Sequence, residues 1–318
     1  MWNILKDGYG NPKKCLASWF CVMLTIFSFC NLKTIAAIGP NKLQWPPDCF
    51  KNEQFTFLVD KTQKFACLLY CLNSDKSDES KVTIPATIKH NGDNLEVVDI
   101  EHEFSNRHPS PERVKIVEIK NGVRKWSPTA LGAFCNLEKL HIPKSVRIKD
   151  GTMFSGLPKN IAIKLNRKDY KYENDTLYDA KKRILIWCNI YGNKYVAPSS
   201  LEVISRNAFC SSEVNCVDLT KTKNLKSIGP YAFAGKEIKR ISIPASVQKI
   251  GNGAFFGCPL ESVTFLKYNP KLIIGYDAFF EESGKNPQIK VPKGTSELFK
   301  NKLKVSGIWD RKSAKAWR

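Results

Sequence analysis

Residues 225–279 read LKSIGPYAFAGKEIKRISIPASVQKIGNGAFFGCPLESVTFLKYNPKLIIGYDAF, and this stretch decides the fold. The phrase L-x-x-I-G-x-x-A-F spans residues 225–233 and returns at 247–255 with valine in place of the leucine. A partial third copy, I-G-x-x-A-F, covers residues 274–279. The phenylalanines that end the three copies lie 22 and 24 residues apart, and self-similarity at such a period predicts a solenoid.

A second phrase lies between these copies and predicts a short strand. It reads I-x-x-I-x-I-P over residues 238–244 and L-x-x-V-x-F over 260–265. Ile241 and Ile243 alternate along the chain, so they share one face of a strand. Pro244 ends that strand, because proline has no N–H to donate to a neighbour. One unit cannot bury its apolar face alone, whereas stacked units form a continuous parallel sheet over a shared core.

The repeat extends well beyond its clearest copies. Lys81–Ile88 parallels Ile241–Val247, which places the start of the array near residue 80. Less regular strand phrases follow at residues 95–100, 114–119, 137–143 and 161–163. Clean copies then run from about residue 196 to 292, so most of the chain belongs to one array.

Two hairpins accompany the array. Phe55–Asp60 and Phe65–Tyr70 alternate in hydrophobicity on either side of an aspartate-led turn, which is typical of a β-hairpin. The same pattern interrupts the period at about 165–195, where Leu58, Asp60 and Phe65 are matched by Leu177, Asp179 and Ile184. The repeat is therefore predicted to have a short form and a form that carries a hairpin.

The N-terminal residues predict export. Met1–Lys14 carries three lysines, and Cys15–Leu32 is an uncharged run of 18 residues that small residues follow. This pattern matches a secretory signal peptide. The run is also just long enough to remain as a signal anchor, with the lysines on the cytoplasmic side. No second apolar run of this length follows, so we expect no C-terminal membrane anchor.

These features divide the chain into four parts. They are a signal peptide or signal anchor at 1–37, an N-terminal cap with a hairpin at 38–79, the repeats at 80–299, and a basic tail at 300–318. The tail contains Trp309 and Trp317. We expect it to be either a cap helix with a frayed end or a basic aromatic patch for an anionic surface.

The formal net charge is +20, and most of it lies outside the N-terminal run. A charge this positive favours acidic partners, which include nucleic acid, sulfated or sialylated glycans, and anionic membrane surfaces. The alternative is that dispersed lysines only keep the protein soluble. Nucleic acid is disfavoured, because no recognition motif occurs and export would remove the protein from that partner.

Eight of the eleven cysteines follow the apolar run, and an even number in an exported chain permits disulfides. The candidate pairs are Cys49 with Cys67 or Cys71, and Cys210 with Cys216. Their connectivity cannot be deduced from sequence. A cysteine that follows the A-F phrase, such as Cys210, also suits a buried packing position.

Neither a catalytic nor a metal-binding constellation is recognisable. H-E-x-x-H, a glycine-rich phosphate loop and G-x-S-x-G are absent. His102 stands between Glu101 and Glu103, but adjacent strand positions point to opposite faces. Cys67 and Cys71 resemble half of a zinc site that has no second half at zinc spacing. We therefore expect no enzyme, no cofactor and no metal site.

Residues 238–258 resemble the repeat of the BspA-like leucine-rich repeat family, L-x-x-I-x-I-P-x-S-V-x-x-I-G-x-x-A-F-x-x-C. The resemblance is specific over about 196–292 and looser over 80–163. It implies a right-handed leucine-rich-repeat solenoid with a concave parallel sheet, so the predicted fold class is a β-rich α/β solenoid with hairpin inserts. It also implies the family's usual setting, in which secreted or surface proteins of bacteria and anaerobic protozoa adhere to host matrix or to other cells.

We predict a non-enzymatic extracellular binding module, secreted or at the cell surface. Its partner is expected to be a cell-surface protein or an acidic glycan, with a membrane involved only if the N-terminal run remains as an anchor. The candidate binding residues are outward positions of the clean copies, namely Asn215, Asp218, Lys239, Arg240, Ser242, Glu261, Ser262 and Thr264. Asn174, in an N-D-T sequon, is a candidate for N-glycosylation. The alternative is a structural coat or self-associating protein, because solenoid ends can stack.

Overall fold

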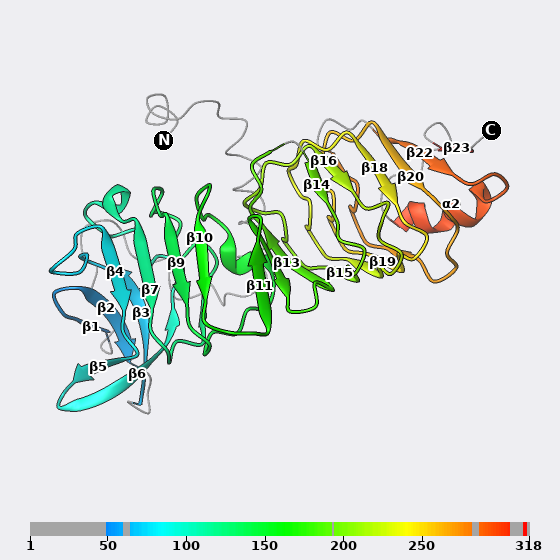
Figure 1. The fold of residues 1–318 in the computed structure, drawn as a ribbon. Coiled ribbons are helices and arrows are strands. Elements are labelled where there is room, and N and C mark those ends of the chain that lie inside the picture. The colour runs from blue at the N-terminus through cyan, green and yellow to red at the C-terminus, as the bar shows by residue number, and fades with distance from the viewer. Residues whose placement is uncertain (1–48, 60–63, 193, 282–285, 306–313, 317–318) are drawn as a thin grey trace, which may run out of the picture.

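The computed structural model describes residues 49–59, 64–192, 194–281, 286–305 and 314–316. These residues form a solenoid of short strands with one α-helix, α2 (Ser296–Val305) (Figure 1). The predicted solenoid and its parallel sheets are confirmed, but an α/β class is not. The links between strands are tight turns in which residues such as Asn207, Tyr231 and Asp277 take positive φ, and such turns leave no room for helices.

The predicted signal peptide or signal anchor lies outside the described residues, as do residues 306–313 and 317–318 of the basic tail, which include Trp309 and Trp317. Within the described part, no helix has the length and apolar character needed to cross a membrane. The helix predicted near the start of the tail is α2, which closes the C-terminal end of the solenoid (Figure 1).

In the C-terminal half, the strand phrase forms a parallel sheet, as predicted. Its strands in sheet order are β18 (Arg240–Ile243), β20 (Ser262–Phe265), β22 (Gln288–Val291) and β23 (Ala314–Ala316). Beside β18 lies a separate parallel pair, β14 (Lys194–Val196) and β16 (Cys216–Asp218) (Figure 1). Ile241 and Ile243 of β18 are buried and Arg240 is exposed, so the alternation of the sequence decides which side chains enter the core.

A second parallel sheet forms from the I-G phrase, which was not expected to contain strands. Its two-residue strands are β15 (Val203–Ile204), β17 (Ser227–Ile228), β19 (Lys249–Ile250) and β21 (Ile273–Ile274). Gly251 follows β19, and a Cβ placed there would lie 2.4 Å from the backbone nitrogen of Pro230 in the preceding coil. Glycine is required at this bend because the backbones of neighbouring coils touch.

The phenylalanines of the A-F phrase stack as a ladder inside this half. Centroid distances are 4.4 Å for Phe209–Phe233, 5.0 Å for Phe233–Phe255 and 5.4 Å for Phe255–Phe279, and all four rings are buried. Helix α2 adds Phe299, whose ring centroid lies 4.8 Å from that of Phe265. The core of the C-terminal half is thus a column of aromatic rings that the last helix covers.

The N-terminal half follows the same plan with less regular coils. Its predicted strands form a parallel sheet of β4 (Lys81–Ile84), β7 (Ile116–Ile119), β9 (Lys139–Ile142) and β10 (Ala162–Leu165) (Figure 1). The opposite, mixed sheet contains β1 (Cys49–Lys51), β2 (Phe55–Val59), β3 (Phe65–Cys71), β5 (Thr87–His90), β6 (Asp93–Ile100) and β8 (Lys125–Trp126). Strands β2 and β3 are antiparallel, which confirms the first predicted hairpin.

The predicted hairpin insert is also confirmed, and it separates two hydrophobic cores. Strands β11 (Tyr170–Glu173), β12 (Thr176–Asp179) and β13 (Ile184–Cys188) are antiparallel, and β13 pairs in parallel with β15. Leu177 and Trp187 pack into the N-terminal core, whereas Tyr178 and Leu185 pack into the C-terminal core. The two sides of one hairpin therefore close both cores.

The coils continue to stack past this insert. The N–H of Gly151, at the start of the 3₁₀ turn η2 (Gly151–Phe154), donates to the carbonyl of Arg206 at 3.0 Å. A Cβ at Gly151 would lie 2.3 Å from the carbonyl oxygen of Asn207, so the two coils are in direct backbone contact. The coils therefore remain in direct backbone contact next to the hairpin insert.

Candidate binding surface

The predicted binding residues come from neighbouring strands of the C-terminal sheet. Arg240 lies opposite Ser262 and Ser242 opposite Thr264 in the adjacent strands β18 and β20. The structure places Asn215 directly before β16, Asp218 at its end, and Lys239 and Glu261 directly before β18 and β20. Most of these side chains are exposed or half-buried, but Ser262 is buried with 7% exposure. Ser262 is therefore a poor binding residue, because it is enclosed where an outward position was expected.

The charged groups among these predicted residues are already partners of one another. The Glu261 carboxylate lies 3.8 Å from Lys239 Nζ and 3.7 Å from Arg240 Nη1. Asp218 accepts hydrogen bonds from the hydroxyl and N–H of Thr220, which lower its pKa, and it lies 3.4 Å from Lys194 Nζ. We call this surface the paired face, formed by Lys194, Asn215, Asp218, Lys239, Arg240, Ser242, Glu261 and Thr264.

The N-terminal sheet presents an equivalent surface that sequence reasoning did not select. Its outward side chains form two rows across β4, β7, β9 and β10, in the order of the strands. The first row is Lys81, Ile116, Lys139 and Ala162, and the second is Thr83, Glu118, His141 and Lys164. With Lys120, which follows β7, we call this surface the lysine face.

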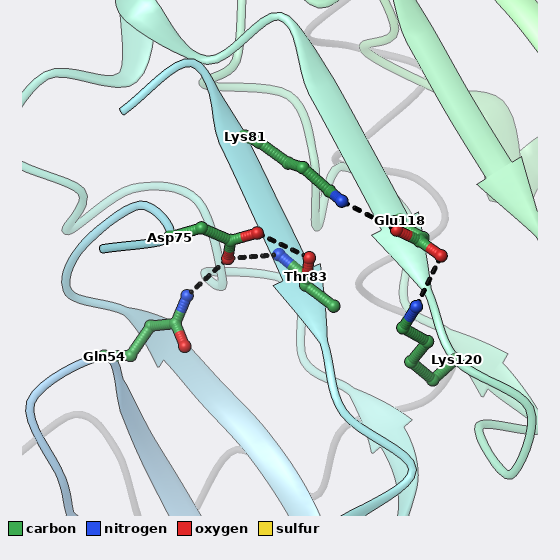
Figure 2. Close-up of polar contacts among 6 residues, drawn as sticks. All are labelled: Gln54, Asp75, Lys81, Thr83, Glu118 and Lys120. Carbon is green, nitrogen blue, oxygen red and sulfur yellow. Dashed lines mark hydrogen bonds and ion pairs between the residues drawn. The ribbon is translucent and has the colours of Figure 1, made fainter. Parts of the chain in front are cut away.

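The single carboxylate of the lysine face is held by two lysines. Lys81 Nζ lies 2.9 Å from Glu118 Oε2, and Lys120 Nζ lies 2.5 Å from Oε1 (Figure 2). The hydrogen bonds from Lys120 and Lys81 lower the pKa of Glu118 to about 2. Glu118 therefore stays charged at any pH near neutral and belongs to an internal cluster with a net positive charge.

Two further cations of this face have no such partner. Lys139 and Lys164 are exposed, and no carboxylate among the described residues forms an ion pair with either. Burial, and next the nearby Lys164, lower the pKa of His141, so its imidazole is neutral at pH 7. Counting the four lysines against Glu118, the lysine face carries three excess positive charges, and the Asp75 carboxylate bonded to Thr83 at its edge reduces this excess to two.

The sequence contains a pattern that predicts the outward residues of the lysine face. Leu137–Pro143 reads L-E-K-L-H-I-P and matches the strand phrase I-x-x-I-x-I-P. Applied here, the alternation that placed Arg240 and Ser242 outside also places Lys139 and His141 outside. The prediction considered only the cleanest copies, and these lie in the other half.

A polar cleft of about 790 Å³ lies at the N-terminal end, between the turn before β2, the loop after β3 and the 3₁₀ turn η1 (Pro111–Arg113). Asp75 in its wall accepts hydrogen bonds from Gln54 Nε2 (2.9 Å) and from the N–H (2.9 Å) and hydroxyl (2.6 Å) of Thr83 (Figure 2). These bonds cover the outer edge of β4, which would otherwise be open to pairing with another strand.

His108 contributes to the same cleft from a buried position. Its Nδ1 accepts the Ser110 N–H at 3.2 Å, which assigns the ring proton to Nε2, 3.1 Å from the hydroxyl of Ser74. Burial lowers the pKa of His108, so the ring is neutral. Because both ring nitrogens hold loops of the cap together, we assign this residue a structural role.

None of the predicted disulfides forms. Cys71 and Cys216 carry free thiols, which excludes the pairs Cys49–Cys71 and Cys210–Cys216. In the remaining candidate pair, Cys49 and Cys67 both lie opposite Leu58, on the two sides of β2. Two strand spacings, about 9.6 Å, separate their backbones, and a disulfide needs Cα atoms within about 7 Å.

Cys67 belongs instead to a small cluster with two carboxylates. Its sulfur and carboxylate oxygens of Asp99 and Glu101 lie within 4.8 Å of one another. Burial raises the pKa of Asp99, and the ammonium of Lys125, 2.7 Å from its Oδ2, supplies the compensating positive charge. Since a lysine already occupies the place of a cation, we do not assign a metal to this cluster.

The environment of His102 differs from the prediction. Residues 102–107 form a turn rather than a strand, so Glu101 and Glu103 both reach the ring, at 3.9 and 3.8 Å. The nearby Glu101 carboxylate raises the pKa of His102. The side chain is 56% exposed, so water surrounds this acid–base group and it has no desolvated site in which to act.

The sequon of the hairpin insert lies in a tight turn. Asn174 and Asp175 both have positive φ, 47° and 54°, between β11 and β12. Asn174 is exposed, whereas Thr176 is 2% exposed and its hydroxyl donates to the Asn174 carbonyl at 3.1 Å. Glycosylation of Asn174 remains a prediction, now at a solvent-facing turn.

Residues 187–286 match the family model described as BspA type leucine rich repeat region, in six copies. The resemblance found in residues 238–258 is thereby confirmed over residues 187–286. Comparison with curated proteins gives no significant match.

Several solved structures of leucine-rich repeat proteins are similar to this chain. A leucine rich cell surface protein from Faecalibacterium prausnitzii is 16% identical, with a TM-score of 0.34, over 82% of this chain and 98% of that one. A leucine-rich repeat protein from Eubacterium ventriosum is 15% identical, with a TM-score of 0.41, over 76% and 85%. One from Bacteroides ovatus is 18% identical, with a TM-score of 0.34, over 84% and 76%.

Proposed function

We propose that this protein is a non-enzymatic extracellular repeat module that attaches to a cell-surface protein or to an acidic glycan. The BspA-type repeats of residues 187–286 support this proposal, because stacked repeats form extended, rigid binding surfaces. The N-terminal run of 18 uncharged residues supports an extracellular location, since it has the pattern of a signal peptide or signal anchor.

One observation carries the proposal: outward side chains of consecutive strands stand in register across each sheet. On the lysine face, four strands place Thr83, Glu118, His141 and Lys164 in one row. On the paired face, Ser242 and Thr264 occupy matched positions in the same way. Weak contacts along a rigid row add together, because the scaffold needs no further ordering when a ligand binds.

Binding explains these polar groups better than catalysis does. Catalysis requires an acid, a base or a nucleophile that converge in a site from which water is excluded. In the described part of the chain, the lysine and paired faces are open sheet surfaces, and the His102 group is solvent-exposed. Side chains spread in this way suit an extended partner.

Retention on immobilised ligands tests the proposal. We expect the purified full chain to bind immobilised heparin or an immobilised matrix protein, and its binding to heparin should fall steeply as salt is added. No retention on either ligand would contradict the proposal. Concentration-dependent assembly in light scattering, without retention, would instead favour a structural coat protein.

Surface labelling of intact cells tests the location. We expect the chain to be labelled from outside the cell, either without its N-terminal run or with that run as an anchor. Recovery of the protein from the cytosol with the run intact would contradict an extracellular function.

A further inference from the structure

We infer that the lysine face is a binding site for a linear anionic glycan, with Lys139 and Lys164 as its principal contacts. The inference rests on the proposed function and names the surface and the ligand chemistry that serve it. Sequence reasoning had placed the site on the paired face, around Lys239 and Arg240.

The spacing of the cations suits a chain that carries regularly spaced anionic groups. Lys139 and Lys164 lie on adjacent strands, two residues apart in register, because Lys139 pairs with Ala162 and His141 pairs with Lys164. Their Cα atoms are therefore about 8 Å apart. Lys81 lies in the row of Lys139 with one strand between them, a further separation of about 9.6 Å.

The negative charge of Glu118 does not prevent an anionic ligand from binding to the lysine face. Lys81 and Lys120 already hold its carboxylate, so an incoming anion meets a cluster with net positive charge (Figure 2). Lys139 and Lys164 meet no carboxylate among the described residues, so an anion can bind them without first breaking an ion pair. On the paired face, by contrast, it would have to compete with Glu261 for both Lys239 and Arg240.

The lack of apolar anchors separates a glycan from other anionic partners. The large, exposed hydrophobic side chains of the described residues are Ile184, Val196, Leu266, Ile273, Tyr276, Phe280 and Leu298, and none lies on β4, β7, β9 or β10. A membrane surface would need apolar side chains to insert, a protein partner would need apolar or aromatic anchors, and single-stranded nucleic acid would need aromatic stacking platforms. A sulfated or uronic-acid glycan needs only cations at suitable spacing.

Charge reversal with a matched control tests this inference. K139E/K164E reverses the two unpartnered cations of the lysine face, and K239E/R240E makes the same change in net charge on the paired face. Affinity for heparin, measured with the full chain, should fall at least about tenfold in the first variant and remain close to wild type in the second. K139R/K164R keeps both charges and should retain binding. Circular dichroism and thermal unfolding confirm that each variant is folded.

The outcomes separate this inference from the proposed function. Loss of heparin binding in K239E/R240E but not in K139E/K164E would overturn the inference and leave the function standing. Wild-type binding to a matrix protein but not to heparin would have the same consequence. Binding to neither would overturn both. Tighter binding to phosphatidylserine vesicles or to DNA than to heparin would overturn the assignment to a glycan.

Discussion

The lysine face and the paired face are built from the same strand phrase, but their charges are arranged differently. On the paired face, Glu261 lies within ion-pair distance of Lys239 and Arg240. On the lysine face, Lys139 and Lys164 have no carboxylate partner among the residues that the structure describes. Burial constrains only the inward positions of a strand, so two faces of equal architecture are free to differ in charge. An acidic ligand is therefore best sought where cations lack partners, rather than where the repeat is most regular.

The two cores differ as well. In the C-terminal core the rings of Phe233, Phe255 and Phe279 are nearly parallel, with interplanar angles of 13° and 8°. In the N-terminal core, Phe104–Phe134 and Trp126–Phe154 meet edge to face, at 89° and 88°. Coils of nearly equal length place like residues above one another, whereas unequal coils place different residues in contact. Stacked pairs such as Phe154–Trp187, at 20°, also occur in the N-terminal core, but among the described residues they do not continue as a ladder from coil to coil.

Removing one ring from each core should give the largest effect. We expect Phe233→Ala and Phe134→Ala each to lower the free energy of unfolding by about 3–5 kcal/mol, because both side chains are fully buried. Hydrogen exchange should show lost protection mainly in the half that carries the substitution, since the hairpin separates the cores. Equal loss of protection on both sides of residues 170–188 would show that the two halves form a single cooperative unit.

Substitution at the coil bend should have a smaller effect. We expect Gly251→Ala to destabilise the protein by about 1–3 kcal/mol, because the added Cβ would lie 2.4 Å from Pro230 N. Gly192→Ala is the matched control, since its Cβ would meet only Ile190 Cγ2, at 3.9 Å. Urea unfolding measures both variants. A Gly251→Ala variant as stable as Gly192→Ala would mean that the tight stacking of the C-terminal coils is not required.

Much of the fold could be predicted, because the repeating residues are those that the core selects. Alternating pairs such as Ile241 and Ile243 predicted the strands correctly in both halves. The second sheet was missed, because two-residue strands such as Lys249–Ile250 are too short to show alternation. The helical content that an α/β class implies is not confirmed, since turns with positive φ make the links between strands.

The binding surface was less predictable, for two physical reasons. Alternation identifies which side chains point outward, but it does not show that Glu261 neutralises Lys239 and Arg240 across a coil. Nor does it show that Cys49 and Cys67 lie on opposite sides of β2, too far apart for a disulfide. Both facts depend on which strands are neighbours in space, and alternation along one strand does not contain that information.

The pH dependence of binding would sharpen the contrast between the faces. His141 is neutral at pH 7 because its pKa is lowered, and it gains charge as the pH falls through that lowered value, below about 6.5. Lys81, Lys139, Lys164 and Glu118 face it, and Glu118, with a pKa of about 2, does not titrate in this range. We therefore expect heparin affinity to rise about two- to fivefold as the pH is lowered from 7 through this lowered pKa.

His141→Gln provides the control for this effect. Its affinity at pH 7 should match that of the wild type, and its increase at low pH should be lost, because the group that gains charge is absent. Heparin binding measured by calorimetry at several pH values distinguishes the two proteins. An unchanged pH profile in the variant would place the titrating group, and with it the ligand, away from the lysine face.

Freeing the cations of the paired face should give the smallest effect. Glu261→Gln removes the carboxylate 3.8 Å from Lys239 Nζ and 3.7 Å from Arg240 Nη1. The stability should change by less than about 0.5 kcal/mol, because these side chains are exposed and exposed ion pairs contribute little. This effect is measured in the K139E/K164E background, in which the lysine face no longer binds heparin. Heparin affinity should rise roughly twofold as Lys239 and Arg240 become available. If affinity does not rise although the protein remains folded, cations without partners are not sufficient. The spacing of the lysines across β9 and β10 would then be what distinguishes the two faces.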